Sequence, residues 1–509
     1  MKYVKSILYL FIVCSFLSCV TSKRITIQDD GKIDFTFLQL NDVYEIAPIQ
    51  GGKYGGLARV ETVHQELLKE NKNTLLFMAG DFLNPSLLGT LKHEGKRIRG
   101  KQMIEVLNAM QFDLVAFGNH EFDLPITALQ ARLNESTFPW ISSNVYEKKA
   151  EKTGRFYTYQ KGDSIAVHDT YSKELTDTDG TKIRIGFISV CIPSNPKPYV
   201  LYKDIFSEAT RAYNSIKDQV DLVIGLTHVT IAQDKELLRL LPEIPLIMGG
   251  HEHTNTLVSV GNGVVAKADA NAKTAYVHRL SFDKSTGVTS IDSQLKSIDD
   301  SIVSNAAIAT IVEKWQTVLR TKIKEIIPDP EAIIYTTDIP LEGRDTPTRS
   351  VQTNLGELIT KSMSYAYQDT VDCALVNGGS IRIDDVLEDA MTAVTVFRVL
   401  PYGGPVLKIT VTGSLLERIL IYGEKAAGTG AYLQRHQVSR NTAGEWLVQD
   451  VPINKEATYT VAISDYLLKG FDIPFLSEEN TEVLTVYRPK TTEIAGDIRK
   501  AVVLYLENK

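Results

Sequence analysis

Five apolar runs in the first half of the chain end on side chains that can bind a metal ion. The first run, residues 35–40, is followed by Asn41-Asp42. The other four run into Gly80-Asp81, Gly118-Asn119-His120-Glu121, Thr227-His228 and Gly249-Gly250-His251-Glu252-His253. A single residue of this kind is ordinarily a helix cap or a loop polar group. Five successive ends that use four of the nine histidines indicate one shared site, because ligands gather at the carboxyl ends of strands in layered α/β sheets.

The residue types indicate the class of metal site. Carboxylate, amide and imidazole ligands without a thiolate suit Zn, Mn, Fe or similar ions rather than a structural zinc. A carboxylate with ligands on both sides can bridge, which favours two ions in one site. Two ions a few ångström apart can hold a hydroxide between them and clamp a phosphoryl oxygen. The pattern therefore predicts a hydrolase of phosphate esters.

Buried strands that alternate with helices must position these side chains. The strand-like runs are residues 35–40, 74–79, 113–117, 222–226 and 245–248. Their length, flanking residues and β-branched content are typical of buried strands in a layered α/β domain. Residues 59–70 and 101–110 have the pattern of intervening helices.

A helical segment divides the chain. Residues 301–326 carry apolar side chains at helical spacing, and Pro328 and Pro330 then end the helix. We expect a catalytic domain over residues 33–300, a connecting helix and linker over 301–330, and a second domain over 331–509. The second domain mixes helices at residues 355–367 and 413–422 with strand-like runs at 373–376, 406–411 and 459–463.

The composition and the N-terminal residues limit the classes of partner that we expect for the protein. A chain of 509 residues is too long for one core. Its net charge of −7 gives no sign of the basic patches of nucleic-acid binders. Residues 1–19 read as a signal peptide, with two lysines, an apolar run and a final Cys19.

Cys19 also resembles the cysteine of a bacterial lipobox. We therefore expect an exported lipoprotein of the periplasm or cell envelope, which meets a membrane only through an N-terminal lipid anchor. The two cysteines beyond the leader, Cys191 and Cys373, lie in distant apolar runs. We expect both to be reduced core residues.

The strand-end residues together resemble the calcineurin-like metallophosphoesterases. Within that group the chain is similar to the 5′-nucleotidase family, which includes periplasmic UDP-sugar hydrolases. Two segments match that family almost letter for letter: Gly118-Asn119-His120-Glu121-Phe122-Asp123 and Gly55-Gly56-Leu57-Ala58-Arg59. The resemblance covers nearly all of the chain after the leader. It implies an α/β fold, with an N-terminal metallophosphatase β-sandwich flanked by helices (α/β/β/α) and a C-terminal α/β substrate domain.

The resemblance also implies two divalent metal ions, such as Zn, Mn or Co. Asp81 would bridge them. The remaining ligands would be Asn119, His228 and His251 for one ion, and Asp42 and His253 for the other. The family assigns a catalytic dyad to the positions of His120 and Asp123. A protonated His120 can stabilise charge on the phosphoryl group, and Asp123 would orient it.

Tyr44 is the position where this chain departs from the family, which has a metal-binding histidine there. Three interpretations are open. Tyr44 could ligate as a phenolate, which favours trivalent iron because the reference pKa of tyrosine lies near 10. It could only pack or donate a hydrogen bond, with water in the vacant position. Finally, His253 could compensate, since the family typically carries an amide side chain at that position. We expect the first metal site to be retained.

The second domain supplies a set of residues that resemble a nucleotide site. The resemblance implies that the substrate is held by Arg349, Asn377, Arg382, Tyr402, Tyr466 and Asp472. Aromatic rings stack on a base of any identity, a carboxylate can accept both ribose hydroxyls, and arginine pairs with phosphate. One departure lies next to this set, because Lys469-Gly470-Phe471 stands where the family has Asn-Gly-Gly.

The sequence therefore predicts a phosphomonoester hydrolase that releases phosphate from nucleoside 5′-monophosphates. An alternative within the family is the hydrolysis of UDP-sugars or 2′,3′-cyclic nucleotides. An alternative of another class is a surface lipoprotein that binds nucleotides but is catalytically impaired. The native metals, the base preference and the oligomeric state stay open.

Overall fold

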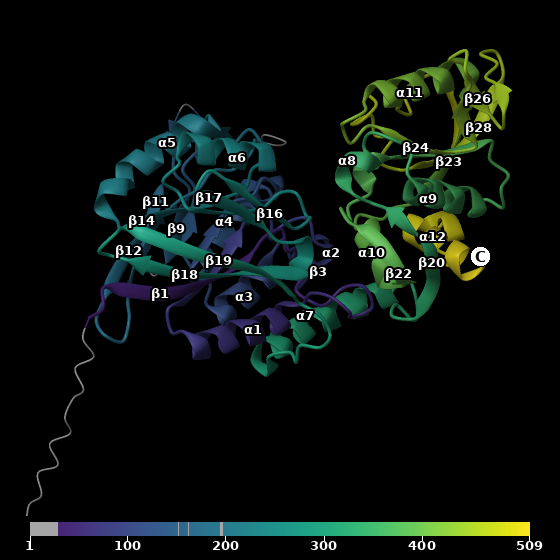
Figure 1. Ribbon diagram of the computed structural model, residues 1–509. Coiled ribbons are helices and arrows are strands. Elements are labelled where there is room, and N and C mark those ends of the chain that lie inside the picture. Colours follow the sequence, from purple (N-terminus) through teal and green to yellow (C-terminus); the bar gives the residue numbers. More distant parts are fainter. Residues whose placement is uncertain (1–28, 151, 161, 194–196) are drawn as a thin grey trace, which may run out of the picture.

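Two six-stranded sheets stack face to face in the first part of the chain (Figure 1). The computed structural model describes residues 29–150, 152–160, 162–193 and 197–509. The first sheet has the order β19-β18-β1-β2-β5-β6 and the second has the order β11-β12-β14-β15-β17-β16. The strands of the first sheet are β1 (Lys32–Leu40), β2 (Thr74–Ala79), β5 (Leu114–Ala116), β6 (Trp140–Ile141), β18 (Thr274–Asp283) and β19 (Val288–Ser297). Those of the second are β11 (Thr170–Thr176), β12 (Lys182–Ile188), β14 (Leu222–Thr227), β15 (Leu246–Gly249), β16 (Thr256–Val260) and β17 (Gly263–Lys267).

The space between the sheets is filled by large apolar side chains. The Phe187 ring of β12 lies 6.1 Å from the Phe37 ring and 5.2 Å from the Phe77 ring, measured between centroids. Successive side chains of a strand point to opposite faces, so Phe37 faces this core while Leu38 faces the helices. Both faces are covered, which explains the nearly continuous apolar runs in the sequence.

Helices cover the outer face of each sheet. Over the first sheet lie α1 (Leu57–Glu70), α3 (Lys101–Met110) and α4 (Ile126–Glu135). Over the second lie α5 (Ile205–Ile216) and α6 (Ile231–Leu240). The predicted α/β/β/α arrangement is confirmed, and the helix expected at residues 101–110 has those bounds.

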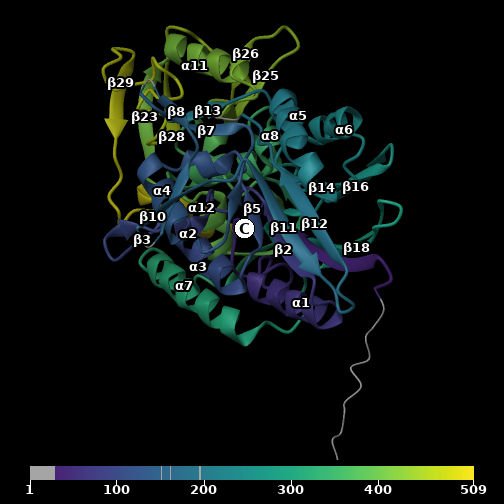
Figure 2. The same ribbon diagram turned by 90° about the vertical axis from the view of Figure 1, so that its left-hand side faces the viewer.

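A long helix, α7 (Ala306–Lys324), follows the sandwich and packs against α1 and α3 (Figures 1 and 2). Its Trp315 is buried, and its Lys314 forms an ion pair with Glu105 of α3. The helix begins at Ala306 rather than at the expected residue 301. Asn305 caps it by accepting hydrogen bonds from the amides of Ala307 and Ile308. The two stacked sheets, their helices and α7 are called the N-terminal domain below.

The rest of the chain, from β20 (Ile333–Glu342) onward, is called the C-terminal domain. Its five-stranded sheet has the order β24-β21-β28-β23-β29. The strands are β21 (Cys373–Asn377), β23 (Val406–Thr412), β24 (Leu433–His436), β28 (Thr458–Ser464) and β29 (Val483–Tyr487). One face is covered by α11 (Gly413–Lys425), and the other by α9 (Asn354–Tyr365) and α12 (Ile498–Glu507) (Figure 1).

Smaller elements complete both domains. In the C-terminal domain these are α8 (Asp345–Thr348), β22 (Val386–Thr392), α10 (Ala393–Val399), β25 (Val438–Arg440), β26 (Trp446–Val448) and β27 (Val451–Pro452). In the N-terminal domain they are α2 (Leu87–Thr90), β3 (Lys92–His93), β4 (Lys96–Arg97), β7 (Val145–Lys149), β8 (Lys152–Gly154), β9 (Tyr157–Gln160), β10 (Asp163–Ala166) and β13 (Val200–Tyr202).

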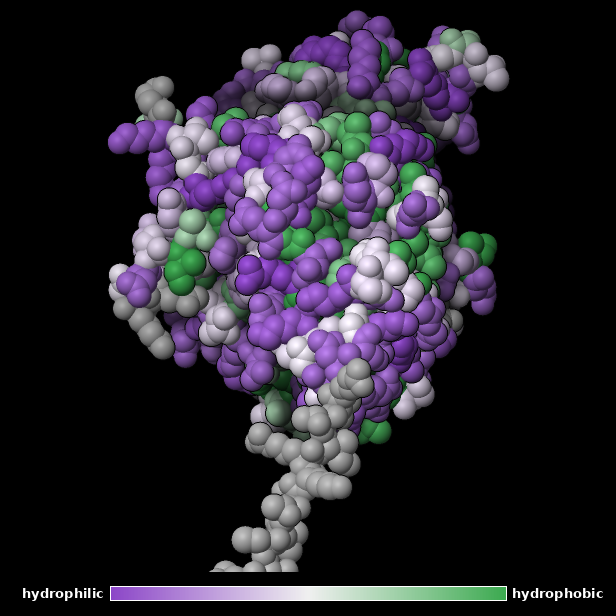
Figure 3. Space-filling model, turned by 60° about the vertical axis from the view of Figure 1, so that its left-hand side comes forward, coloured by the Kyte–Doolittle hydropathy of each residue, from purple (hydrophilic) through white to green (hydrophobic). Residues whose placement is uncertain are grey.

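The surface shown in Figure 3 is mostly hydrophilic, with smaller hydrophobic areas between the polar side chains. None of the helices in the described part of the chain combines the length and the apolar character that a membrane span requires. Cys191 and Cys373 are buried and free, as expected. The predicted signal peptide, residues 1–19, lies outside the described residues.

Candidate active site

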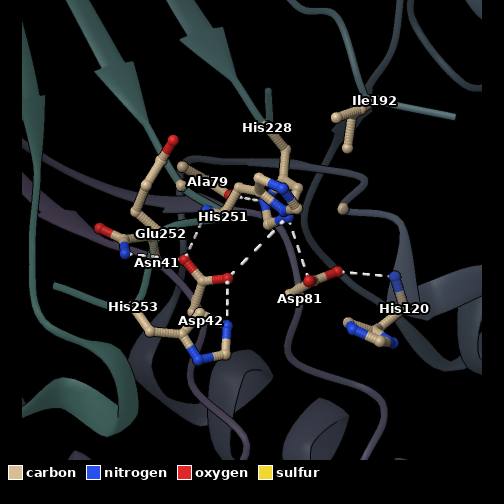
Figure 4. Close-up of polar contacts among 12 residues, drawn as sticks. Asn41, Asp42, Ala79, Asp81, His120, Ile192, His228, His251, Glu252 and His253 are labelled. Atoms are coloured by element: carbon tan, nitrogen blue, oxygen red, sulfur yellow. Dashed lines mark hydrogen bonds and ion pairs between the residues drawn. The ribbon is translucent and has the colours of Figure 1, made fainter. Parts of the chain in front are cut away.

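Asp42, Asp81 and His228 meet at one edge of the sandwich (Figure 4). Each offers one ligand atom, and these atoms lie within 4.8 Å of one another. Nε2 of His228 is 3.0 Å from Oδ2 of Asp81 and 3.9 Å from Oδ1 of Asp42. Asp42 and Asp81 follow β1 and β2 of the first sheet, whereas His228 follows β14 of the second. The site is therefore built where the carboxyl ends of strands from both sheets converge.

The backbone is bent sharply where it presents these side chains. Asp42 and Asp81 have φ angles of 54° and 56°, in the left-handed region that side-chain-bearing residues rarely adopt. Close packing adds to the constraint at Gly118, where a Cβ atom would lie only 2.1 Å from Oδ1 of Asp81. Conformations of this kind persist at functional sites because the surrounding structure fixes them.

Three buried atoms in this cluster have no hydrogen-bond partner: Oδ1 of Asp42, Oδ1 of Asn119 and Nε2 of His228. Nδ1 of His228 is 2.7 Å from the carbonyl oxygen of Ala79 and donates to it, so Nε2 faces the carboxylates. A buried polar atom without a partner is costly. Oxygen and imidazole nitrogen atoms that lack a hydrogen bond in this way fit a divalent cation.

The two carboxylates of the cluster also favour a positive charge beside them. Burial alone would lower the pKa of His228, but the carboxylates of Asp81 and Asp42 raise it to about 9. Burial opposes ionisation of Asp42 as well, yet the neighbouring His228 and His253 lower its pKa.

The other expected metal ligands lie around this cluster. The backbone amide of His251 donates to Oδ2 of Asp42 at 2.9 Å, and its ring lies 5.5 Å from that of His228. Burial, followed by the charge of His228, lowers the pKa of His251 to about 4, and the neutral imidazole is the form that binds metals. Nε2 of His253 is 3.3 Å from Oδ1 of Asp42. Asn119 follows β5 and is buried.

Tyr44 lies inside the same site. Its hydroxyl donates to Oδ2 of Asp81 at 3.3 Å and is 3.1 Å from Nε2 of His253. Burial raises the pKa of Tyr44 well above 10, and the carboxylates of Asp81 and Asp42 add to the effect. These contacts place the Tyr44 hydroxyl beside two of the expected metal ligands, Asp81 and His253.

His120 and Asp123 form a pair on the 3₁₀ turn η1 (His120–Asp123). Nδ1 of His120 is 2.7 Å from Oδ2 of Asp123, and the His120 amide donates to Oδ1 of Asp81 at 2.8 Å. Burial lowers the pKa of His120, but the carboxylates of Asp81 and Asp123 outweigh it, so that the pKa is raised.

A cleft of about 690 Å³ lies between the two domains. Its wall includes Asp123 and all six residues expected to hold a substrate: Arg349, Asn377, Arg382, Tyr402, Tyr466 and Asp472. Tyr402 and Tyr466 are 60% and 38% exposed, so both rings are open to a ligand. Nδ2 of Asn377 donates to Oδ2 of Asp472 at 2.8 Å. The cleft thus has aromatic rings, a fixed carboxylate and arginines, and it reaches Asp123, the partner of His120.

Comparison with known families matches both parts of the chain. Residues 35–255 match the calcineurin-like phosphoesterase model, and residues 333–478 match the model of the 5′-nucleotidase C-terminal domain. The chain belongs to the 5′-nucleotidase family. It is a phosphoester hydrolase, and its metallophosphoesterase domain implies divalent metal ions.

Individual 5′-nucleotidases align with most of the chain. The 5′-nucleotidase of Vibrio cholerae is 25% identical, and the alignment covers 92% of this chain and 90% of that protein. The snake venom 5′-nucleotidase of Crotalus adamanteus is also 25% identical, with 87% and 82% covered. The crystal structure of a 5′-nucleotidase precursor from Thermus thermophilus has the same fold, with a TM-score of 0.66, 21% identity and coverage of 94% and 96%.

Glu121, for which no role was expected, supports the candidate active site. Its carboxylate accepts hydrogen bonds from four backbone amides, those of Asp81, Phe82, Leu83 and Gly118, at 2.7–2.9 Å. It therefore ties the loop after β2 to the loop after β5. Burial, followed by the charge of Asp81, raises the pKa of Glu121 to about 7. Its place in the Asn119-His120-Glu121 motif is a signal that could have identified it.

Lys267 supports the part of the site that follows the strands of the second sheet. This fully buried side chain donates to the carbonyl oxygens of Val229 and Gly250 at 2.5 and 2.7 Å. It also pairs with the carboxylates of Asp234 and Glu252. The ammonium group therefore joins the loop that carries His228 to the loop that carries His251. A lysine on a strand gives no sequence signal for such a role.

Proposed function

We propose that this 5′-nucleotidase-family enzyme hydrolyses nucleoside 5′-monophosphates to a nucleoside and phosphate. The observation that carries the proposal is the single cleft shared by Asp123 and the six candidate substrate residues. A nucleotide has three parts to recognise, and the cleft has a matching group for each. Tyr402 and Tyr466 would stack on the base, Asp472 would accept the ribose hydroxyls, and Arg349 and Arg382 would pair with the phosphate.

Two divalent ions are part of the proposal. We assign Asp81 as the bridging ligand between them. The other assigned ligands are Asn119, His228 and His251 for one ion, and Asp42 and His253 for the other. When bound, the ions would supply Lewis-acid chemistry at the phosphoryl group. The buried atoms of Asp42, Asn119 and His228 that lack a hydrogen bond support this assignment.

His120 would act on the phosphoryl group, with Asp123 orienting its ring. Asp123 holds the proton of Nδ1, which leaves Nε2 of His120 directed away from it. A protonated imidazole can donate from Nε2 to a phosphoryl oxygen as charge develops in the transition state. The raised pKa of His120 favours that protonated form.

The N-terminal residues complete the proposal. Residues 1–19 have the pattern of a signal peptide with a lipobox-like Cys19. We infer that the enzyme is exported and acts on nucleotides in the periplasm or at the cell envelope. Globomycin-sensitive processing and labelling with a fatty acid would test the lipoprotein part of this inference.

Phosphate release tests the proposed reaction. Metal-stripped protein should release phosphate from AMP only after Mn²⁺, Zn²⁺ or Co²⁺ is added, and EDTA should abolish the release. Hydrolysis of UDP-glucose or of 2′,3′-cyclic AMP forms a nucleoside monophosphate rather than free phosphate, so the consumption of all three substrates should be followed by chromatography. AMP should give the highest kcat/KM. A higher kcat/KM for either competitor would overturn the substrate assignment. Nucleotide binding without phosphate release under any metal would overturn the reaction itself.

A further inference from the structure

His253 is contacted by both domains of the protein. On one side its Nε2 lies 3.3 Å from Oδ1 of Asp42, one of the candidate metal ligands of the N-terminal domain. On the other side its Nδ1 lies 3.1 Å from Oδ2 of Asp384 and 3.2 Å from the carbonyl oxygen of the same residue. Asp384 belongs to the C-terminal domain, in the loop just before β22.

Asp384 is held in place to make this contact. Its Oδ1 accepts a hydrogen bond from the amide of Asp345 at 2.7 Å, which leaves Oδ2 for His253. Its φ angle of 45° is in the left-handed region. The backbone of His253 is fixed as well, because its carbonyl oxygen accepts a hydrogen bond from Ala270 at 3.0 Å.

The two nitrogens of an imidazole ligand have different tasks. The nitrogen that binds the metal must be deprotonated, so the proton of the neutral imidazole is on the other ring nitrogen. A carboxylate or carbonyl that accepts this proton fixes the tautomer and the orientation of the ring and makes the ligand more basic. Asp384 offers both kinds of acceptor to Nδ1 of His253, and Nε2 is consequently directed at Asp42.

We propose that Asp384 is a positioning residue for His253, so that the C-terminal domain completes the metal site of the N-terminal domain. The affinity of the protein for the ion on the Asp42 side then depends on contact between the two domains. The proposal rests on the assignment of His253 as a ligand in the proposed function.

The neighbouring residue provides a matched control. Asp385 also reaches the N-terminal domain, where its carboxylate is 3.0 Å from Nζ of Lys273. Asp385 pairs with Lys273 rather than with a proposed metal ligand, so its replacement removes an interdomain ion pair without disturbing His253 directly. The comparison separates a role in orienting the ligand from a general role in holding the domains together.

Calorimetric titration of the metal-stripped full-length protein with Mn²⁺ tests the proposal. In Asp384→Asn we expect one of two ions to bind about 10- to 100-fold more weakly, the usual cost of losing such a partner. The other ion should bind as in the wild type, and Asp385→Asn should bind both ions as the wild type does. Circular dichroism of each stripped variant checks that the fold is intact. Unchanged binding in Asp384→Asn would overturn the proposal.

A double-mutant cycle makes the test independent of folding. A glutamine ligand has no second ring nitrogen to be held, so Asp384→Asn should have no further effect on metal binding in a His253→Gln background. An equal loss in both backgrounds would show that Asp384 acts by another route. His253→Ala removes the ligand altogether, and if it leaves metal binding unchanged, the ligand assignment in the proposed function is wrong. If instead the wild type binds two ions and Asp384→Asn has no effect on their binding, only the proposal about Asp384 fails.

Discussion

Nη2 of Arg382 lies 3.7 Å from Oδ2 of Asp123, across the boundary between the two domains. Asp123 is the carboxylate that holds His120, so a cationic side chain of one domain meets the dyad of the other. A substrate phosphate bound by Arg382 would lie beside His120. Under the proposed function, one domain would carry the metal ligands and the dyad, and the other would bring the nucleotide to them.

Removing the imidazole of His120 should affect the chemical step more than binding. We expect His120→Ala to lower kcat by about 10²- to 10⁴-fold, the usual contribution of general acid–base catalysis. The dissociation constant for AMP, measured in EDTA to prevent turnover, should stay within about twofold, since the work of His120 is done in the transition state. His436→Ala, which alters a histidine of β24 outside the cleft, is the control. A loss confined to AMP binding would contradict the assignment.

The two tyrosines of the cleft should matter only for substrates that carry a base. Tyr402→Ala or Tyr466→Ala should weaken AMP binding by roughly 1–3 kcal/mol, the value of one stacking contact. Hydrolysis of p-nitrophenyl phosphate, which lacks a base and a ribose, should keep its kcat/KM in both variants. The conservative Tyr402→Phe change should restore AMP binding. Equal losses for both substrates would mean that the rings only pack.

Ribose recognition should weaken in acid because of Asp472. Burial raises the pKa of this carboxyl above 3.8, although Asn377 and Tyr466 counteract part of the rise. Its ionised form is the acceptor for ribose, so affinity is full above the raised pKa and is lost as pH falls through it. A nucleoside is the suitable probe, because the phosphate of a nucleotide itself titrates near pH 6. Binding measured from pH 7 to pH 4 should decline in the wild type and stay flat and weak in Asp472→Asn.

The buried ammonium of Lys267 should be essential for stability. Lys267→Met leaves the carboxylates of Asp234 and Glu252 without their cation, and breaking a buried pair in this way typically costs about 3–5 kcal/mol. Thermal unfolding should show a clear drop in Tm. Lys182→Met removes an exposed ion pair with Glu174 and should cost less than about 1 kcal/mol. Equal melting temperatures for the two variants would disprove this role of Lys267.

A histidine at position 44 should strengthen the metal site. The Tyr44 hydroxyl is already within hydrogen-bonding distance of Asp81 and His253, and an imidazole there would add a neutral nitrogen ligand. We expect Tyr44→His to bind the ion on the Asp42 side about tenfold more tightly, or about 1.4 kcal/mol. Tyr44→Phe, which keeps the ring and removes the hydroxyl, is the control and should change affinity less. Calorimetry with Mn²⁺ measures both, and weaker binding in Tyr44→His would refute the prediction.

The strand ends could be predicted from the sequence because their signals are local. Each run of apolar residues is long enough for a strand, and each stops at a polar residue, so Asp42, Asp81 and His228 could be identified without knowledge of the sheet order. Local patterns also located the helix at residues 101–110. The motif that contains His120 and Asp123 is equally compact, since the two residues are three positions apart.

Asp384 and Lys267 could not be predicted in the same way. The contact between Asp384 and His253 joins residues 131 positions apart, in different domains, and Asp384 stands in a loop without a distinctive motif. Lysine side chains ordinarily lie on the surface, so the residue type of Lys267 gives no sign that it is buried. It is buried because four oxygen acceptors from two loops and a helix surround it. Only the packed chain reveals such surroundings.

The chain passes from one domain to the other through residues 325–332, between α7 and β20. Since α7 packs on the N-terminal domain, everything from β20 onward forms one contiguous segment. Such a segment can be exchanged as a cassette, by recombination in evolution or by chimera construction in the laboratory, to give the same metal centre a new specificity. If the inference about Asp384 holds, an incoming cassette must also bring an acceptor for His253, and substrate choice and metal retention would then be inherited together.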